Sequence, residues 1–379
     1  MKEIENSKYN PEIETEDLGN QTITKPFIPS KIRIDQQNVN LGLIIEMLKF
    51  EEINLMPDFQ RKAGLWSDKQ KSQLIESVLL GLPLPSFYFS VDSLTNKWVV
   101  VDGLQRLSTF KSFIIDKTLI LDGLEFLEQY KGKNYDKLSR EDIRKISGFK
   151  INLYLIDKET PHNVKFLIFK RVNSGGLDLE PQEMRHALNQ GKPAEFIKKM
   201  SNLDEFKFAT ENKIRTDRQE DRDFANRFVA FYLLGYENKY EGELDTFLNT
   251  GMALLNEKSE NELNDIMAAF RNAMTLSLEI FGKNTFRKMY SNENRRNPIS
   301  KSVFDTISVN LAWLSMEEQQ IIKSKSNIFI EKLLKLFDDK DSDFHRSITT
   351  GTGQKTSVFF RFSTIKNLLK EIIENDKKI

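Results

Sequence analysis

The sequence predicts an α+β protein in which a mixed α/β domain is followed by a mainly α-helical C-terminal region. In the first half, short runs of β-branched and aromatic residues at 87–89, 98–101 and 151–156 alternate with segments of helical apolar spacing. From about residue 192 onward the helical spacing continues almost without interruption. Because 379 residues exceed one ordinary core, more than one domain is expected.

Three parts of the chain are predicted: a flexible N-terminal tail over residues 1–26, an α/β domain over 27–192 and a helical domain over 193–379. The tail holds six acidic and three basic residues and little that could be buried. The expected strands are 32–34, 87–89, 98–101, 118–121 and 151–156. The expected helices of the α/β domain are 39–50, 68–80 with Ser67 as N-cap and Gly81 as terminator, 104–114, 139–146, 161–172 and one containing Glu183. In the helical domain, breaks are expected near Gly242, Gly251, Asn297 and Gly351.

The composition limits what the chain can do. Hydrophobic residues make up 39% and charged residues 30%, and no apolar run is as long as a membrane span, so we expect a cytoplasmic protein without a membrane partner. The absence of cysteine excludes disulfides and thiolate metal sites. Three scattered histidines favour neither a zinc site nor a histidine-metal nuclease centre, so nuclease activity is not expected of this chain.

The stretch from 98 to 114 predicts a phosphate site. A buried strand, an Asp102-Gly103 turn and a new helix follow one another, which directs several helix N-terminal N–H groups at one point. Gly103 lets a phosphate approach, Arg106 adds a guanidinium group, and Asp102 is suited to a metal ion or a sugar hydroxyl. In the alternative interpretation, Asp102 only caps the helix and Arg106 only pairs with a surface carboxylate.

Two further loops carry similar groups at the ends of apolar elements. One contains Gln60 and Arg61, and the other begins with Arg171 and Asn173. Binding residues concentrate on loops that rigid elements support. If the three loops converge, they form one anion-lined pocket.

These motifs resemble the N-terminal domain of the GmrSD type IV restriction endonucleases, whose usual signature is Asp-Gly-Gln-Gln-Arg. The corresponding residues here are Asp102-Gly-Leu-Gln-Arg106, and the resemblance extends over about residues 30–192. It includes the aromatic-Gln-Arg motif at 59–61, the linker 81–85, and Arg-Val-Asn-x-Gly-Gly at 171–176 with Glu183 and Arg185 after it. The family is thought to be related to the ParB/sulfiredoxin-like fold, whose phosphate-binding Gly-x-x-Arg turn is similar to 103–106.

The resemblance implies a nucleotide-binding protein that serves DNA restriction or phage defence. The leading interpretation is an Mg²⁺-dependent NTPase that lacks a nuclease domain and works with a separate nuclease or defence-system subunit. In it, Asp102, Gln105 and Gln60 are catalytic, Asp102 holds Mg²⁺, and the nucleotide is bound by Gly103, Arg106, Arg61, Arg171 and Asn173. The alternative is a non-catalytic ParB-like nucleotide switch or a DNA- or protein-binding scaffold, favoured by Leu104 in place of the first Gln of the signature.

A basic cluster in the second half is the expected DNA-binding surface. Arg287, Lys288, Arg295 and Arg296 lie close together, with Glu293 the only acidic residue between them. Such a cluster can contact a nucleic-acid backbone. The alternative is an ordinary solvated charged face, because the formal net charge of the chain is zero.

Overall fold

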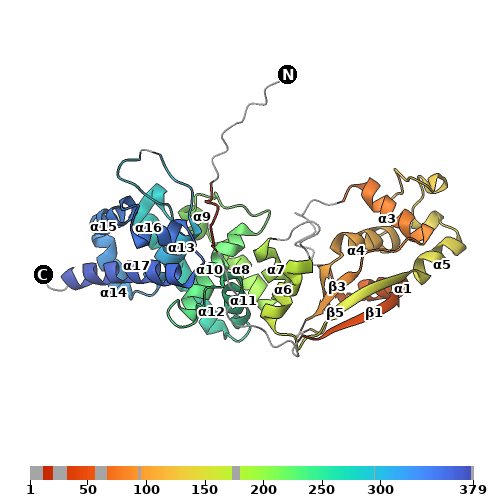
Figure 1. Ribbon diagram of the computed structural model, residues 1–379, viewed down its shortest axis with the longest axis horizontal. Helices are drawn as coiled ribbons and strands as arrows, with labels where there is room; N and C mark the ends of the chain where they lie inside the picture. The colour runs from red at the N-terminus through yellow and green to blue at the C-terminus, as the bar shows by residue number, and fades with distance from the viewer. Residues whose placement is uncertain are drawn as a thin grey trace, which may run out of the picture. The chain divides into compact units, whose positions relative to one another are not determined.

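The computed structural model describes residues 12–19, 32–55, 66–92, 95–172, 180–293 and 295–376 (Figure 1). The chain forms two compact units. The α/β unit is Phe27–Leu188, and the helical unit combines Met1–Pro26 with Asn189–Ile379. The α/β unit is therefore an insertion in the sequence of the helical unit.

A mixed five-stranded sheet forms the centre of the α/β unit, in the order β1-β5-β3-β4-β2. The strands are β1 (Ile34–Asn40), β2 (Ile53–Asn54), β3 (Phe87–Val91), β4 (Trp98–Asp102) and β5 (Lys150–Ile156). The pairs β1–β5 and β3–β4 are antiparallel, whereas β3–β5 and β2–β4 are parallel. The predicted α+β class is confirmed.

Both faces of this sheet are covered by helices. The helices are α1 (Leu41–Lys49), α3 (Asp68–Leu80), α4 (Leu104–Phe110), α5 (Arg140–Gly148), α6 (His162–Val172) and α7 (Pro181–Leu188), and a π-helical turn, Lys111–Ile115, extends α4. Val100 of β4 packs into the apolar cluster under α1, α3 and α4. Val99 and Val101 point to the opposite cluster, which α6 and α7 complete. Residues on both faces of β4 are thus buried, which explains its uninterrupted run of valines.

Local sequence signals fix several element boundaries. Ser67 and Gln70 form a reciprocal capping box at the start of α3, and Gly81 ends that helix at a φ of +75°, so both predictions are confirmed. The strand predicted at 118–121 is wrong. There, Leu121 exchanges backbone hydrogen bonds with Gly132 and Lys133, outside the sheet.

The helical unit is built around phenylalanine side chains. Its helices are α8 (Lys192–Ser201), α9 (Asp204–Ala209), α10 (Glu220–Leu234), α11 (Leu244–Leu254), α12 (Glu260–Phe281), α13 (Lys301–Ala312), α14 (Met316–Ser324), α15 (Ser326–Asp338), α16 (Asp343–Thr349) and α17 (Lys355–Asp376). The rings of Phe224 and Phe304 meet edge to face at 4.9 Å in its core. The break predicted at Gly251 is wrong, because α11 continues through it. A Cβ at Gly251 would lie 2.5 Å from the Ala230 Cβ, so this glycine allows α10 and α11 to pack closely.

Residues 12–19 differ from the flexible tail that the composition suggested. The Glu14 N–H donates to the Ile299 carbonyl at 2.8 Å, and the Ile299 N–H donates to the Glu12 carbonyl at 2.9 Å. Composition could not reveal this, since the partners are nearly 300 positions away in the sequence. In the described part of the chain, no helix is long and apolar enough to cross a membrane.

Candidate functional site

The predicted strand–turn–helix unit is present at the end of β4. Gly103 sits between Asp102 and the first residue of α4 with a φ of +100°. A Cβ at this position would also lie 2.5 Å from the ring of Phe87. The conformation and the close approach of Phe87 each favour glycine here. The turn therefore depends on the residue that the motif supplies.

Arg106 is buried beneath this turn, with 9% of its side chain exposed. Its guanidinium group donates to the Pro85 carbonyl, to the Ser86 carbonyl at 3.2 Å and to Asp102 Oδ2 at 2.7 Å. It also lies 4.3 Å from the centroid of the Phe87 ring. Burial lowers the pKa of Arg106, and the ion pair with Asp102 opposes this shift. Arg106 thus fastens the start of β3 to the β4–α4 turn, where the sequence predicted a direct phosphate ligand.

Asp102 is the last residue of β4 and directly precedes Gly103. It does not cap α4, whose N-terminus has no side-chain cap. Its side chain is 37% exposed, and one carboxylate oxygen is held by Arg106. The first N–H groups of a helix have no partner within the helix, so the start of α4 beside Asp102 can receive an anion. The alternative in which Asp102 caps the helix is therefore wrong.

Gln105 connects this turn to the segment that carries the aromatic-Gln-Arg motif. Its side-chain oxygen accepts a hydrogen bond from the Trp66 backbone N–H at 3.4 Å. Gln60 and Arg61 themselves lie outside the described residues. The segment before them is placed by β2, whose residues Ile53 and Asn54 run parallel to the first residues of β4. The residues before and after the motif, β2 and Trp66, thus both lead to the end of the sheet at which β4 ends.

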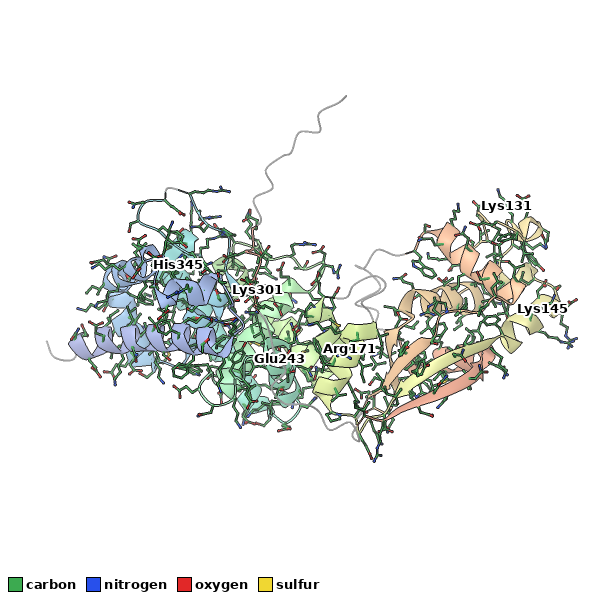
Figure 2. The ribbon with its side chains drawn as sticks, viewed as in Figure 1. Lys131, Lys145, Arg171, Glu243, Lys301 and His345 are labelled. Carbon is green, nitrogen blue, oxygen red and sulfur yellow. The ribbon has the colours of Figure 1, made fainter. Side chains whose placement is uncertain are left out.

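The third predicted loop follows α6. Arg171 is exposed in the last turn of that helix, and Asn173 lies outside the described residues (Figure 2). Ile168 of α6 and Leu104 of α4 pack against the same apolar cluster. The second half of α6 therefore lies toward the end of β4 at which Asp102 is found.

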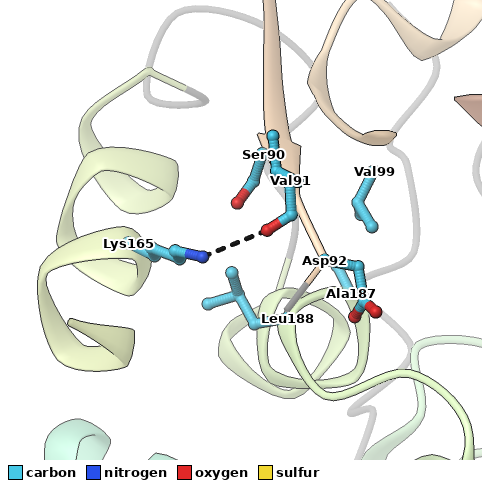
Figure 3. Close-up of a pocket in the computed structure, with 7 residues that line it drawn as sticks. All are labelled: Ser90, Val91, Asp92, Val99, Lys165, Ala187 and Leu188. Atoms are coloured by element: carbon cyan, nitrogen blue, oxygen red, sulfur yellow. Dashed lines mark hydrogen bonds between the residues drawn. The ribbon is translucent and has the colours of Figure 1, made fainter. Parts of the chain in front are cut away.

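A small cavity at the end of the sheet opposite Asp102 is lined by Lys165, a residue that the sequence analysis did not single out. The cavity measures about 10 Å³, and Lys165, Val91 and Leu188 contribute to its lining (Figure 3). Lys165 is 3% exposed and donates to the carbonyls of Val91 and Lys158 at 3.2 and 3.3 Å. Burial lowers its pKa. The volume suffices for about one water molecule, so Lys165 joins strand and loop and does not mark a substrate pocket.

The basic cluster predicted to bind DNA is largely engaged within the protein. The side chains of Arg287 and Lys288 are 3% and 7% exposed and form ion pairs with Glu211 and Glu14 at 3.3 and 2.5 Å. Arg296 also pairs with Glu211, at 2.9 Å. The burial of Arg287 and Lys288 takes these two side chains away from the surface, whereas Arg296 remains 34% exposed and its contact with DNA stays a prediction. Arg295 is exposed.

The acidic residues limit how a metal ion could be held. The described residues include no group of three or more His, Asp or Glu side chains that could bind a metal. Asp102 offers a single half-exposed carboxylate. In nucleotide sites Mg²⁺ is typically held by one or two carboxylates together with phosphate oxygens and water. Asp102 thus fits an Mg²⁺ ion that arrives with a nucleotide.

The α/β domain thus carries a candidate ligand site at the carboxyl end of β4, where the β4–α4 turn and two neighbouring segments meet. Residues 44–190 match the family model of the GmrSD restriction endonuclease, N-terminal domain. For this part of the chain, the match confirms the resemblance that the motifs predicted. No curated protein and no solved structure matches the chain.

Proposed function

We propose that the protein is the nucleotide-binding component of a DNA restriction or phage-defence system, with the nucleotide phosphates at the β4–α4 turn. The observation that carries this proposal is the juxtaposition of the uncapped N-terminus of α4 with the half-exposed carboxylate of Asp102. A helix N-terminus attracts phosphate, and a neighbouring carboxylate can hold the accompanying cation.

Each residue of the turn then has a distinct role. Gly103 lets the backbone approach the phosphates, and Asp102 would hold Mg²⁺, which supplies positive charge against the phosphate oxygens. Arg106 orients Asp102 and is a positioning residue. Gln105 ties the turn to Trp66, and through it to the segment with Gln60 and Arg61. Arg171 and Asn173 would complete the site from the loop after α6.

Hydrolysis of the nucleotide is the finer part of the proposal. In the NTPase interpretation, Gln60 and Gln105 orient the attacking water, and a separate nuclease subunit cleaves DNA. The alternative is a non-catalytic, ParB-like nucleotide switch or a DNA- or protein-binding scaffold. Two observations favour the switch: Leu104 replaces the first Gln of the signature, and the Gln105 oxygen already accepts the Trp66 N–H.

Calorimetric titration with each of the four NTPs and Mg²⁺ tests the binding site. Asp102→Asn should weaken Mg–NTP binding ten- to hundredfold, since losing a charge-assisted contact costs about 1.5–3 kcal/mol. Asp116→Asn is the matched control, because Asp116 is 39% exposed and also pairs with a lysine, Lys111, at 2.7 Å, away from the turn. Equal affinities for the two variants would refute the proposed site. Phosphate release by the wild-type chain then separates an NTPase from a switch.

A further inference from the structure

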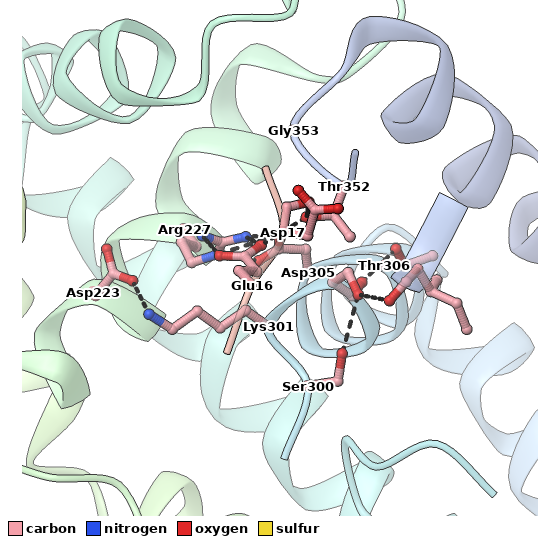
Figure 4. Close-up of polar contacts among 12 residues, drawn as sticks. Glu16, Asp17, Asp223, Arg227, Ser300, Lys301, Asp305, Thr306, Thr352 and Gly353 are labelled. Atoms are coloured by element: carbon pink, nitrogen blue, oxygen red, sulfur yellow. Dashed lines mark hydrogen bonds and ion pairs between the residues drawn. The ribbon is translucent and has the colours of Figure 1, made fainter. Parts of the chain in front are cut away.

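The described N-terminal segment, residues 12–19, is held on the helical unit by a regular series of ion pairs. Glu12 pairs with Lys213 at 3.0 Å, and Glu14 pairs with Lys288 at 2.5 Å. Glu16 pairs with Arg227 at 2.7 Å (Figure 4). The acidic residues occupy every second position, as expected for one face of an extended chain.

The helical unit also binds the backbone of this segment. Ile13 forms a parallel bridge with Ile299, whose N–H and carbonyl both bond to the segment, at 2.9 and 2.8 Å. On its other side Ile299 forms an antiparallel bridge with Arg287. Further along, the Thr352 N–H donates to the Asp17 carbonyl at 2.8 Å. The segment is thus held through its backbone by isolated β-bridge contacts as well as through its carboxylates.

The contacts become more buried toward Glu16. The side chains of Glu12 and Lys213 are 47% and 43% exposed, whereas those of Glu16 and Arg227 are 14% and 2% exposed. The buried guanidinium group of Arg227 is shared between Glu16 and Asp305, whose carboxylate lies 2.8 Å away. Removing Glu16 would leave part of this buried charge without a partner, so the inner pair contributes most of the specificity.

We propose that the surface formed by Lys213, Arg227, Lys288 and Ile299 is a binding site for an extended acidic peptide with carboxylates at every second residue. Residues 12–19 are its intramolecular ligand. A partner protein that presents such a strand would use the same contacts. The carbonyl of Ile299 needs an N–H donor, which a peptide backbone supplies and a phosphodiester backbone lacks. The observations therefore favour a peptide over nucleic acid. The inference is independent of nucleotide binding in the α/β unit.

Because residues 12–19 are tethered, they compete with an external peptide at an effective concentration on the order of millimolar. The intact chain should therefore resist an added peptide of equal intrinsic affinity. A chain that lacks residues 1–19 should accept it. Peptide binding by the shortened chain, compared with the intact chain, is therefore the quantity to measure.

The first experiment titrates a synthetic peptide of residues 11–20 into the chain lacking residues 1–19, followed by calorimetry and by the thermal unfolding midpoint. We expect one peptide per chain, a raised midpoint, and at least tenfold weaker binding when the peptide carries Glu14→Gln and Glu16→Gln. The intact chain should not bind it. Failure to bind, or equal binding of the two peptides, would overturn the proposal. A single-stranded oligonucleotide that displaces the peptide at similar concentration would instead identify a nucleic-acid surface.

A charge exchange in the full-length chain covers the case in which the shortened chain does not fold. Glu14→Lys and Lys288→Glu should each speed hydrogen exchange of the Ile299 amide at least tenfold, because that amide donates to the segment. The double variant should restore slow exchange. If both single variants leave the exchange rate unchanged, or the double variant restores nothing, charge pairing does not hold the segment and the proposal fails.

Discussion

Replacing Arg106 with alanine should destabilise the α/β unit, and the contacts of its side chain give the magnitude. The carbonyls of Pro85 and Ser86 would lose their donors, at a cost of about 1 kcal/mol each, since both residues remain partly hydrated. Loss of the cation over the Phe87 ring adds about 1 kcal/mol. The half-exposed carboxylate of Asp102 would be rehydrated and adds little. The free energy of unfolding of the α/β unit should therefore fall by about 3 kcal/mol.

Urea unfolding combined with hydrogen exchange by mass spectrometry can measure this effect in each unit separately. Exchange should accelerate in peptides covering β3 and α4, while peptides of the helical unit provide an internal control. Arg106→Lys keeps the charge but cannot reach the same three acceptors, so it should recover only part of the loss. Asp102→Asn should cost less than about 1 kcal/mol. If Arg106→Ala unfolds at the wild-type urea concentration, Arg106 does not act as a buried clamp.

Three further substitutions test the packing and electrostatics of the fold. Glu76 is buried and accepts hydrogen bonds from the backbone N–H groups of Glu125, Phe126 and Leu127; burial opposes its charge, but these bonds prevail and lower its pKa. The contribution of Glu76 to stability should therefore be complete above about pH 4.5 and decline as the pH falls through the lowered pKa. Glu76→Gln should lower the free energy of unfolding by about 2 kcal/mol at pH 7 and by less in acid. Urea unfolding at several pH values measures this difference. Gly251→Ala should lower the thermal unfolding midpoint of the helical unit, because overpacking against Ala230 costs about 1–3 kcal/mol and outweighs the gain in helix propensity. Gly148→Ala in α5, where nothing lies within 4 Å of an added Cβ, should be neutral or stabilising, and equal effects of the two substitutions would contradict the packing explanation.

Local rules predicted most of the α/β unit because the information for these elements is close by in the sequence. Ser67 and Gly81 mark the ends of α3, and the valine run of β4 reflects burial on both faces. The sequence misled where a glycine serves tertiary packing, as Gly251 does, since that packing partner is not visible in the local pattern. The short β2 strand was missed because two residues carry no periodicity.

The sequence predicted the strand–turn–helix unit, whereas the ligand-binding roles of its residues stay predictions. The motif correctly placed Asp102, Gly103 and Gln105 around one turn. It could not show that Arg106 faces inward, because an arginine in a first helical turn can either bind a ligand or pair with neighbouring groups of the protein. The basic residues Arg287 and Lys288 misled for a similar reason. Their acidic partners, Glu211 and Glu14, are distant in the sequence, so the cluster appeared unopposed.

The first strand and the last helix of the α/β unit both lie at the end of the sheet that is opposite the candidate site. At one end of the unit, Ile34 of β1 pairs with Ile156, the last residue of β5. Leu188, the last residue of the unit in sequence, lines the small cavity beside Val91. Because β3 and β5 are parallel, Val91 and Ile156 lie at the same end of the sheet. Asp102 lies at the opposite end, because β4 runs antiparallel to β3. Within the α/β unit, the contacts of β1 and of α7 thus lie at one end of the sheet, and the β4–α4 turn lies at the other.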